Sequence, residues 1–477
     1  MKIKKLVIFF LLLAMGSVAI SSGTDLLPNT VKYRLDLTID YSSGKLSGKC
    51  EIILLNHTNQ KIQKIPVLLY RLLSINSISD DRGRPIEFTQ RIVNIKNWEK
   101  IQVNYVEIMP SRDFSPGNKL VLNIDYSGYL LGYSNEGWRY VKDHIDKNFT
   151  IIRTDGFGYP VIGYPDAENM MCIVREKYDY NIDITLPSDV VPVSGGILAG
   201  RTENGKNTTW YFKSIKPSWR LDIAAGDYRT ISKNKVSICY FKNDSMGAEN
   251  ILNDFEKAVS LYSSWFGDLK DFKGFTIIEV PEGYGSQADV AAILLTADSF
   301  NKNHDPSTLY HEASHLWNAG NTESQPSRFE SEGLARFLEN LLVEELDNKQ
   351  DQIAETSQKY LEQVRKDFSK NPDFQNIPIK DYGIRNMTYY SYTLGMVAFA
   401  VLYEKTGCDD FRKMVRTYYS EYHEKGGSLN DFVDCCKKVS SIDLDRYFND
   451  WIYTTRAIKK IMDGMSFREL AEYYRNN

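Results

Sequence analysis

LYHEASHLW, residues 309–317, places two of the chain's six histidines four positions apart, with a glutamate directly after the first. The Asp-Pro pair at 305–306 predicts a helix start just upstream, because an aspartate side chain can accept a bond from a free N–H and proline fits the first turn. On such a helix His311 and His315 share one face, where both imidazoles can reach one ion, and Glu312 stands beside them without ligating it. This is the HExxH pattern of a catalytic zinc helix. An ordinary helix with a solvated face is the alternative.

A third ligand is needed, because a catalytic zinc site takes three protein ligands and keeps one position open for water. The next amphipathic segment, SRFESEGLARFLENLL at 327–342, offers Glu330 and Glu332, which point to different sides of a helix, so at most one should ligate. Glu332 is favoured, because Gly333 beside it would permit close packing of this helix against the histidine-bearing one. Stabilisation of the helix N-terminus is the alternative for either carboxylate.

The composition describes a globular protein of two or three domains. The chain has 477 residues, of which 42% are hydrophobic and 13% aromatic, enough to bury a sizeable core. Its net charge of -4 provides no basic field for phosphate backbones, so nucleic acid is not an expected partner.

Hydrophobic periodicity divides the chain into two unlike halves. From residue 33 to about 230, apolar residues alternate with polar ones in segments such as YRLDLTIDY and KLVLNIDYSG, which predicts two stacked or curled antiparallel sheets. The pattern changes near 231–235, and AENILNDFEKAVSLYSSWFG at 248–267 predicts a helix. Two short strands, FTIIEV and AAILL, follow it, and beyond residue 305 almost everything is predicted helical. The fold class is therefore α+β and multidomain, with an N-terminal antiparallel β-rich saddle or sandwich domain before a mainly helical one.

The first residues, MKIKKLVIFFLLLAMGSVAISSG, are typical of a secretory signal peptide. Three lysines precede a short apolar run, and small residues follow it, with cleavage expected after Ala19 or Ser22. The chain is therefore expected to be secreted or periplasmic, with no stable membrane span after cleavage. An uncleaved N-terminal anchor is the minor alternative, because the run is short for a spanning helix.

The six cysteines do not make a disulfide scaffold in a chain of this length. None has the spacing of a metal knuckle. A bridge from Cys408 to the pair at 435–436 is one alternative, and buried free thiols are the other.

HEASHLW followed by SEGLA resembles the zinc aminopeptidase family typified by aminopeptidase N. The family motif is HExxH, eighteen residues and then Glu, whereas sixteen residues separate His315 from Glu332 here, as in a divergent branch. The resemblance implies one zinc ion held by His311, His315 and Glu332, with Glu312 as the general base. It also implies a thermolysin-like catalytic domain.

A tyrosine on a later helix completes the resemblance. The family has a Tyr in a Tyr-x-Lys-Gly context that donates to the oxyanion, and the matching stretch here is YTLG, with Tyr392, Gly395 and Leu394 in place of the Lys. Tyr389 and Tyr390 lie nearby and are the competing candidates.

The resemblance extends from about residue 30 to 456 and implies a division of the chain. The predicted parts are a signal peptide at 1–22, a β-rich domain at 25–232, a thermolysin-like catalytic domain at 233–456 and a C-terminal helical tail at 457–477. The large C-terminal helical domain of many family members is missing, so access to the cleft is expected to be wider.

The main departure concerns the substrate's amino terminus. The family's Gly-x-Met-Glu-Asn segment lines the cleft and grips the free α-amine through its Glu; it aligns with GSQAD, that is Gly285, Ser286, Gln287, Ala288 and Asp289. Ala288 stands where that Glu should be, and a charge-assisted bond of this kind is worth roughly 1.5 to 3 kcal/mol. Asp289 or Asp155 is a candidate to compensate. The backbone at 283–287 can still pair with an extended peptide as an added strand.

The function expected from these residues is hydrolysis of peptide bonds through a zinc-activated water, with Glu312 moving the proton and Tyr392 stabilising the oxyanion. A peptide or protein is the expected substrate and an aminopeptidase the expected enzyme. Ala288 keeps an endopeptidase or a non-peptide hydrolase open. A noncatalytic binding module that uses the β-rich domain is the alternative from another class. The oligomeric state leaves no trace in the sequence.

Overall fold

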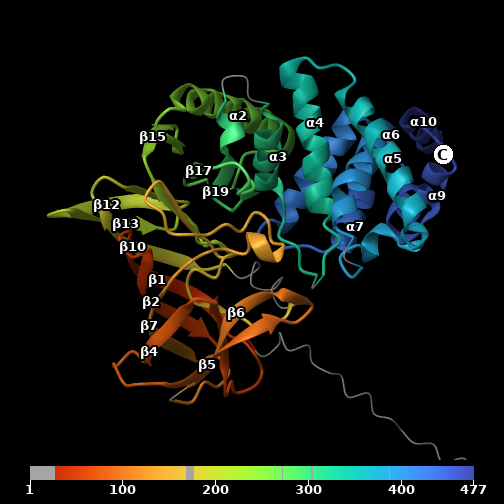
Figure 1. The fold of residues 1–477 in the computed structure, drawn as a ribbon. Helices are drawn as coiled ribbons and strands as arrows, with labels where there is room; N and C mark the ends of the chain where they lie inside the picture. The colour runs from red at the N-terminus through yellow and green to blue at the C-terminus, as the bar shows by residue number, and fades with distance from the viewer. Residues whose placement is uncertain are drawn as a thin grey trace, which may run out of the picture.

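A β-rich N-terminal half leads into a mainly helical C-terminal half (Figure 1). The computed structural model describes residues 27–110, 112–167, 177–270, 272–301, 305–323, 325–385 and 387–476. The predicted signal peptide lies outside the described residues, as does Cys172.

The largest sheet of the N-terminal half has seven strands in the order β12-β13-β10-β1-β2-β7-β4. Every second residue of β1 from Leu35 to Ile39 is buried, so the alternation predicted from the sequence faces a core. One pair departs from the predicted antiparallel pattern, because β1 runs parallel to β10, with Tyr33 opposite Tyr180. Between these two strands the chain builds three more strands of the same sheet and strands of two other sheets, and it then returns in the direction of β1. The seven strands are β1 (Asn29–Asp40), β2 (Lys45–Leu55), β4 (Leu73–Ser79), β7 (Lys119–Gly128), β10 (Asp179–Pro187), β12 (Ile197–Asn204) and β13 (Asn207–Lys213).

Two smaller sheets complete the N-terminal half. One has the order β5-β6-β3-β9 and packs with the seven-stranded sheet around a shared hydrophobic core. The other has the order β11-β14-β8. Their strands are β3 (Ile65–Tyr70), β5 (Glu87–Ile95), β6 (Trp98–Met109), β8 (Phe149–Ile152), β9 (Val161–Ile162), β11 (Val191–Ser194) and β14 (Ile223–Gly226).

A mixed five-stranded sheet, ordered β15-β16-β17-β19-β18, opens the C-terminal half. Its strands are β15 (Tyr228–Lys233), β16 (Val236–Phe241), β17 (Phe275–Val280), β18 (Gln287–Ala288) and β19 (Ala292–Thr296). Strand β15 overlaps residues 231–235, where the periodicity of the sequence changes. A small hydrophobic cluster, which includes Phe149, Ala224, Ile278 and Leu294, joins this sheet to the three-stranded one and so couples the two halves.

Helices form the rest of the C-terminal half and bury a second large core against the five-stranded sheet (Figure 1). Helix α3 begins at Ser307, whose N–H donates to Asp305 Oδ1 at 3.0 Å, so the predicted start is one residue early. Helix α6 contains a break at Gly407, which has φ 77°. The helices are α2 (Ser245–Phe266), α3 (Ser307–Ser314), α4 (Leu334–Asp347), α5 (Gln352–Lys370), α6 (Tyr389–Tyr422), α7 (Leu429–Val439), α8 (Asp445–Phe448), α9 (Arg456–Met462) and α10 (Phe467–Arg475).

The fold class predicted from the sequence is confirmed: a β-rich N-terminal domain precedes a mainly helical one. Within the described parts of the chain, no helix is both long and apolar enough to cross a membrane. Cys408, Cys435 and Cys436 are free thiols, so the alternative of a bridge between them is not realised.

Candidate metal centre

Three side chains converge where helix α3 meets the segment leading into helix α4. His311 lies in the last turn of α3, His315 begins the short turn η4 (His315–Trp317), and Glu332 lies in the π-helical turn η5 (Phe329–Gly333). Their ligand atoms all lie within 4.8 Å of one another. Among the described residues they are the one group of three or more His, Cys, Asp or Glu side chains that could hold a metal ion.

The spacing of these ligand atoms fits zinc. Glu332 Oε2 lies 3.3 Å from His311 Nε2 and 3.5 Å from His315 Nε2. Ligand atoms bound about 2.0–2.1 Å from a tetrahedral ion stand about 3.3 Å apart. Two imidazole nitrogens and one carboxylate oxygen are also a donor set of catalytic zinc sites, in which a fourth position stays open. The three residues predicted as ligands are therefore brought together, and Glu332 lies at a distance from each histidine that fits a shared zinc ion.

A second carboxylate supports His311 from behind. Glu339 Oε2 lies 3.2 Å from His311 Nδ1, and Arg336 Nη1 donates to both oxygens of Glu339 at 2.7 and 2.8 Å. Burial lowers the pKa of His311, but the bonds to Glu332 and Glu339 outweigh it and raise that pKa to about 9. A proton held on Nδ1 by Glu339 leaves the Nε2 lone pair directed at the ion position.

The sequence reasoning missed Glu339 and Arg336. They follow Glu332 by seven and four residues, so all three share one helix face. That spacing, counted from a proposed ligand, is the signal that could have found them.

His315 has a partner on its own turn. Asn318 Nδ2 lies 2.7 Å from His315 Nδ1, and Asn318 is the residue at which turn η4 ends. A histidine that ligates through Nε2 carries its proton on Nδ1, so the Asn318 carboxamide would present its oxygen to that proton when an ion is bound. Both histidines therefore have a group that can fix the ligating tautomer.

Glu312 is buried, with 9% of its surface exposed, beside the ligand group. Burial raises its pKa, the charges of His311 and His315 lower it, and those of Glu332 and Glu339 raise it again; the net shift is upward. A raised pKa suits a general base or acid, because proton transfer is most effective when the pKa lies near the working pH.

Of the three candidate tyrosines, Tyr392 lies at the ligand group. Its ring is stacked with that of His311, with centroids 6.2 Å apart and planes 12° from parallel. Burial raises its pKa, and the neighbouring Glu332 carboxylate raises it further, so the hydroxyl keeps its proton and can donate it. Tyr389 is 59% exposed and accepts a bond from Gln363, while Tyr390 packs against an aromatic pair formed by Phe368 and Phe374.

The glycine beside Glu332 packs against a different helix from the one expected. A Cβ on Gly333 would lie 2.9 Å from Gly395 Cα and 3.0 Å from the Ser391 carbonyl oxygen, both in helix α6. Gly333 therefore lets α6, and with it Tyr392, approach Glu332. Helices α3 and α4 do contact each other, as predicted, but the close contact at Gly333 itself is with α6. The glycine of SEGLA and the glycine of YTLG thus contact each other.

Glu330, the rival for the third ligand position, is not part of the ligand group. Asn321 Nδ2 donates to Glu330 Oε1, and burial raises the pKa of this carboxyl to about 7. The two glutamates do lie on different sides of the turn, as predicted.

Within the segment 285–289, strand β18 (Gln287–Ala288) is the edge strand of the five-stranded sheet. Strand β18 pairs with β19 on one side, Gln287 opposite Leu294 and Ala288 opposite Ile293, and it contacts helix α3. Ser286 Oγ accepts a bond from the Thr296 N–H at 3.3 Å. Pairing of an extended peptide with the backbone at 283–287 stays a prediction.

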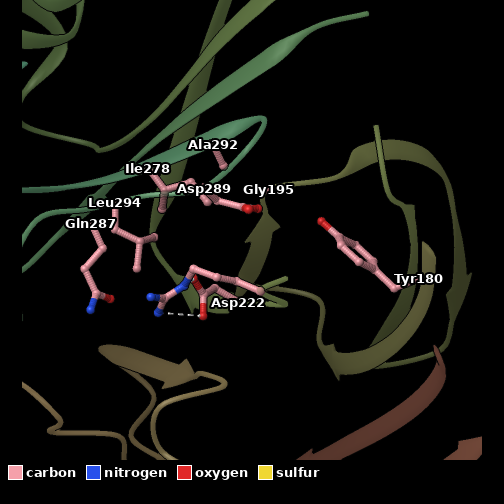
Figure 2. A pocket seen from close by; sticks show the side chains of 9 residues that line it. Tyr180, Gly195, Asp222, Ile278, Gln287, Asp289, Ala292 and Leu294 are labelled. Carbon is pink, nitrogen blue, oxygen red and sulfur yellow. Dashed lines mark hydrogen bonds and ion pairs between the residues drawn. The ribbon is translucent and has the colours of Figure 1, made fainter. Parts of the chain in front are cut away.

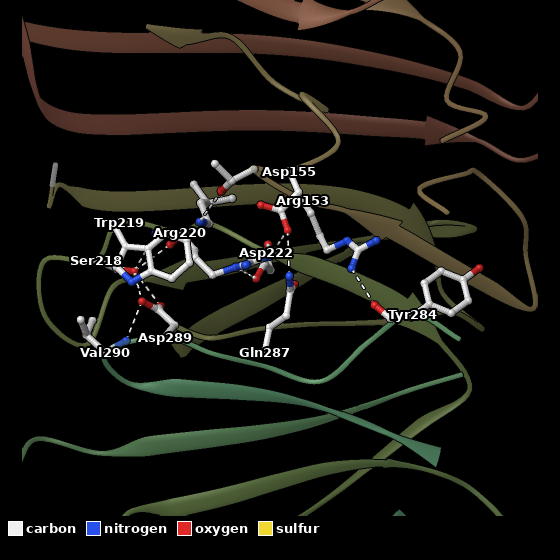
Figure 3. Close-up of polar contacts among 12 residues, drawn as sticks. Arg153, Asp155, Ser218, Trp219, Arg220, Asp222, Tyr284, Gln287, Asp289 and Val290 are labelled. Atoms are coloured by element: carbon white, nitrogen blue, oxygen red, sulfur yellow. Dashed lines mark hydrogen bonds and ion pairs between the residues drawn. The ribbon is translucent and has the colours of Figure 1, made fainter. Parts of the chain in front are cut away.

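Neither acid considered as a substitute for Glu at position 288 is free. Ser218 Oγ lies 2.6 Å from each Asp289 oxygen, and burial raises the pKa of Asp289 to about 6. Asp289 therefore faces the N-terminal half. Asp155 Oδ2 accepts bonds from Arg220 at 3.2 Å and from Gln287 Nε2 at 3.0 Å (Figure 3).

These contacts belong to a polar network between the two halves of the chain. Arg220 also pairs with Asp222 at 2.6 Å, so two carboxylates, those of Asp155 and Asp222, hold its guanidinium. A cavity of about 10 Å³, room for about one water, lies beside them and is lined by Tyr180, Gly195, Arg220, Asp222, Ile278, Gln287, Asp289, Ala292 and Leu294 (Figure 2). The network ties β18 to the N-terminal half through Gln287.

Comparisons with known proteins identify the fold. No protein-family model matches the sequence, and no curated protein matches it. Solved structures do match. The M1 zinc metallopeptidase from Deinococcus radiodurans, as an E323A mutant bound to a Tyr-Ser-Ala substrate, superposes with TM-score 0.65 at 16% identity, covering 89% of this chain and 94% of that one. The enzyme without the mutation superposes with TM-score 0.65 at 15% identity over 90% and 94% of the two chains. A two-domain M1 zinc metallopeptidase mutant bound to L-arginine gives TM-score 0.62 at 15% identity over 92% and 95%. At these identities the comparison shows a shared two-domain fold.

Proposed function

We propose that this chain is a zinc-dependent metallopeptidase. The observation that carries the proposal is the convergence of His311, His315 and Glu332 at zinc spacing, with Glu312 and Tyr392 beside them. The fold shared with M1 zinc metallopeptidases supports it, because those proteins are zinc peptidases of the same two-domain design.

Each residue of the group has a distinct task in peptide hydrolysis. A bound zinc ion would supply a Lewis acid for the scissile carbonyl and make water more acidic. Glu312 takes the proton from the attacking water and passes it to the leaving amine. Tyr392 keeps its proton at neutral pH and donates a hydrogen bond to the developing oxyanion. Glu339 and Asn318 orient the two imidazoles throughout the reaction.

Within this class we propose an aminopeptidase. The neighbouring structures include one bound to the tripeptide Tyr-Ser-Ala and others bound to single amino acids. The free edge of β18 beside helix α3 offers a place for an extended peptide backbone.

An endopeptidase is the second candidate, and Ala288 favours it. A methyl group at this edge position cannot hold an ammonium, so nothing at 288 restrains cleavage to the chain end. A free edge strand without such a group can accept a peptide of any length.

Product mapping by mass spectrometry separates these candidates. The zinc-loaded mature protein is given two peptides of one sequence, with a free and an acetylated N-terminus, and Glu312→Gln protein serves as the control. Stepwise loss of N-terminal residues from the free peptide alone supports the aminopeptidase. Internal cuts in both peptides identify an endopeptidase, and cleavage of neither would favour a non-peptide substrate or a binding module.

We also propose that the protein is exported, on the evidence of residues 1–22 alone. N-terminal sequencing of the protein from its natural host tests this. A mature chain that starts after Ala19 or Ser22 is expected, and a retained Met1 would support the uncleaved anchor.

A further inference from the structure

Arg328 adopts an unusual backbone conformation next to the candidate ligand Glu332. Its φ of 64° and ψ of 15° place it in the left-handed region, which a non-glycine residue seldom occupies. Such residues persist only where their surroundings fix them, and they concentrate at functional sites.

The surroundings of Arg328 hold this turn firmly. The Arg328 carbonyl accepts the N–H groups of Glu332 at 2.9 Å and Gly333 at 3.4 Å, which starts the turn that carries the ligand. The preceding carbonyl, that of Ser327, accepts a bond from Ser391 Oγ in the helix that bears Tyr392. Arg328 is therefore fixed at its backbone between the two elements that supply Glu332 and Tyr392.

The side chain of Arg328 is poorly satisfied by the protein. It is 41% exposed, and its one ion pair among the described residues joins Nη1 to Glu332 Oε1 at 3.8 Å, beyond hydrogen-bond distance. An exposed pair at this separation contributes little to stability. Burial raises the pKa of Tyr392, and the positive charge of Arg328 opposes that shift, so the guanidinium acts on the tyrosine as well as on Glu332. A planar cation with five donors thus stands open at the rim of the ligand group.

We propose that Arg328 binds a carboxylate of the substrate and so makes this enzyme selective for peptides that carry one. The inference rests on the proposed peptidase function. A guanidinium matches the two oxygens of a carboxylate, and that pairing is stronger than a bond between neutral groups. The carboxylate has two sources, the C-terminus of a short peptide and the side chain of an acidic residue.

Three peptides with the same N-terminal residue distinguish the sources: Leu-Ala-Ala with a free C-terminus, its C-terminal amide, and Leu-Glu-Ala amide. We expect the wild type to hydrolyse at least one of the two peptides that carry a carboxylate with a kcat/KM about tenfold above that of Leu-Ala-Ala amide, which carries none. Preference for the free acid identifies the C-terminal carboxylate, and preference for the glutamyl peptide identifies the side chain. Equal kcat/KM for all three peptides would overturn the proposal while leaving the peptidase function intact.

Variants assign the preference to Arg328. In Arg328→Gln the ratio of kcat/KM between the preferred carboxylate-bearing peptide and Leu-Ala-Ala amide should fall to about one, and Arg328→Lys should retain part of the preference. Arg201→Gln is the matched control. Arg201 lies in strand β12, is also exposed, and forms a similarly long ion pair with a neighbouring glutamate, at 3.7 Å. Zinc content and circular dichroism separate a lost carboxylate contact from a lost metal or fold. A variant that keeps the full preference would contradict the assignment.

A binding measurement covers the case in which no peptide is hydrolysed. Calorimetry on zinc-loaded Glu312→Gln protein should give tighter binding of a carboxylate-bearing peptide than of Leu-Ala-Ala amide, by about tenfold, and the double variant with Arg328→Gln should not discriminate. If the wild type hydrolyses none of the three peptides but this binding preference is seen, the result would refute the peptidase function and support the carboxylate site. Equal or undetectable binding of all three peptides would refute the carboxylate site.

Discussion

Replacing Glu339 with glutamine should weaken zinc binding without disturbing the ligands themselves. Glu339 holds His311 Nδ1 at 3.2 Å and is itself held by two bonds from Arg336. Glutamine keeps the shape and one oxygen but removes the charge on which both contacts depend. Loss of such a supporting group typically costs 10–100-fold in metal affinity, or about 1.4–2.8 kcal/mol.

The pH dependence sharpens this prediction. In the metal-free protein, Glu332 and Glu339 raise the pKa of His311 to about 9. At pH 7 a proton therefore competes with zinc for the His311 imidazole of the wild type. Glu339→Gln lowers that pKa, and proton competition in the variant is smaller. The affinity difference between wild type and variant should therefore widen from pH 7 to pH 9.

The assay is a zinc titration against a chelator of known affinity. Glu344→Gln is the matched control on the same helix, since Glu344 Oε1 accepts the Ile353 N–H at 2.8 Å and has no contact with the histidines. The control should lose about 1 kcal/mol of stability and none of its zinc affinity. Equal zinc affinity in wild type and Glu339→Gln, or an equal loss in both variants, would refute the role given to Glu339.

Three further predictions follow from single contacts. Glu312→Gln should bind zinc as the wild type does and lose turnover by at least 100-fold, as seen by metal analysis beside a peptidase assay; retained activity would remove Glu312 from the mechanism. Gly395→Ala should lower the free energy of unfolding by about 1–3 kcal/mol and reduce kcat. The added Cβ would lie 2.8 Å from Gly333 Cα and push Tyr392 away. An unchanged melting temperature and an unchanged kcat would show that α6 is not constrained there. Burial raises the pKa of Glu279 to about 8 from 4.5, so the folded state binds the extra proton and stability should fall as pH rises from 4.5 to 8. In Glu279→Gln the decrease in the free energy of unfolding over this pH range, measured by denaturant unfolding, should be smaller by roughly 2–4 kcal/mol. Identical pH profiles of wild type and variant would contradict this.

The ligand group was predictable because it depends on local spacing. HExxH places His311 and His315 on one helix face whatever the fold around them, and Glu332 follows from the need for a third ligand and from the SEGLA resemblance. The strand pattern of the N-terminal half was equally local, since alternation such as that of β1 reports one buried face.

What the sequence left open depends on tertiary contacts. Gly333 was expected to meet the histidine helix, but its partner is Gly395, which lies 62 residues further along the chain. Asp289 was a candidate for the substrate amine, yet it accepts its bond from Ser218 in the other half. The parallel pairing of β1 with β10 also spans more than a hundred residues. Periodicity describes which face is buried and not what covers it.

The central claim, that His311, His315 and Glu332 hold one zinc ion, is tested most directly by anomalous diffraction at the zinc edge from crystals of the zinc-loaded protein. We predict a single strong peak about 2.0–2.2 Å from His311 Nε2, His315 Nε2 and Glu332 Oε2. A peak at other residues, or none at this position in zinc-saturated protein, would contradict the account.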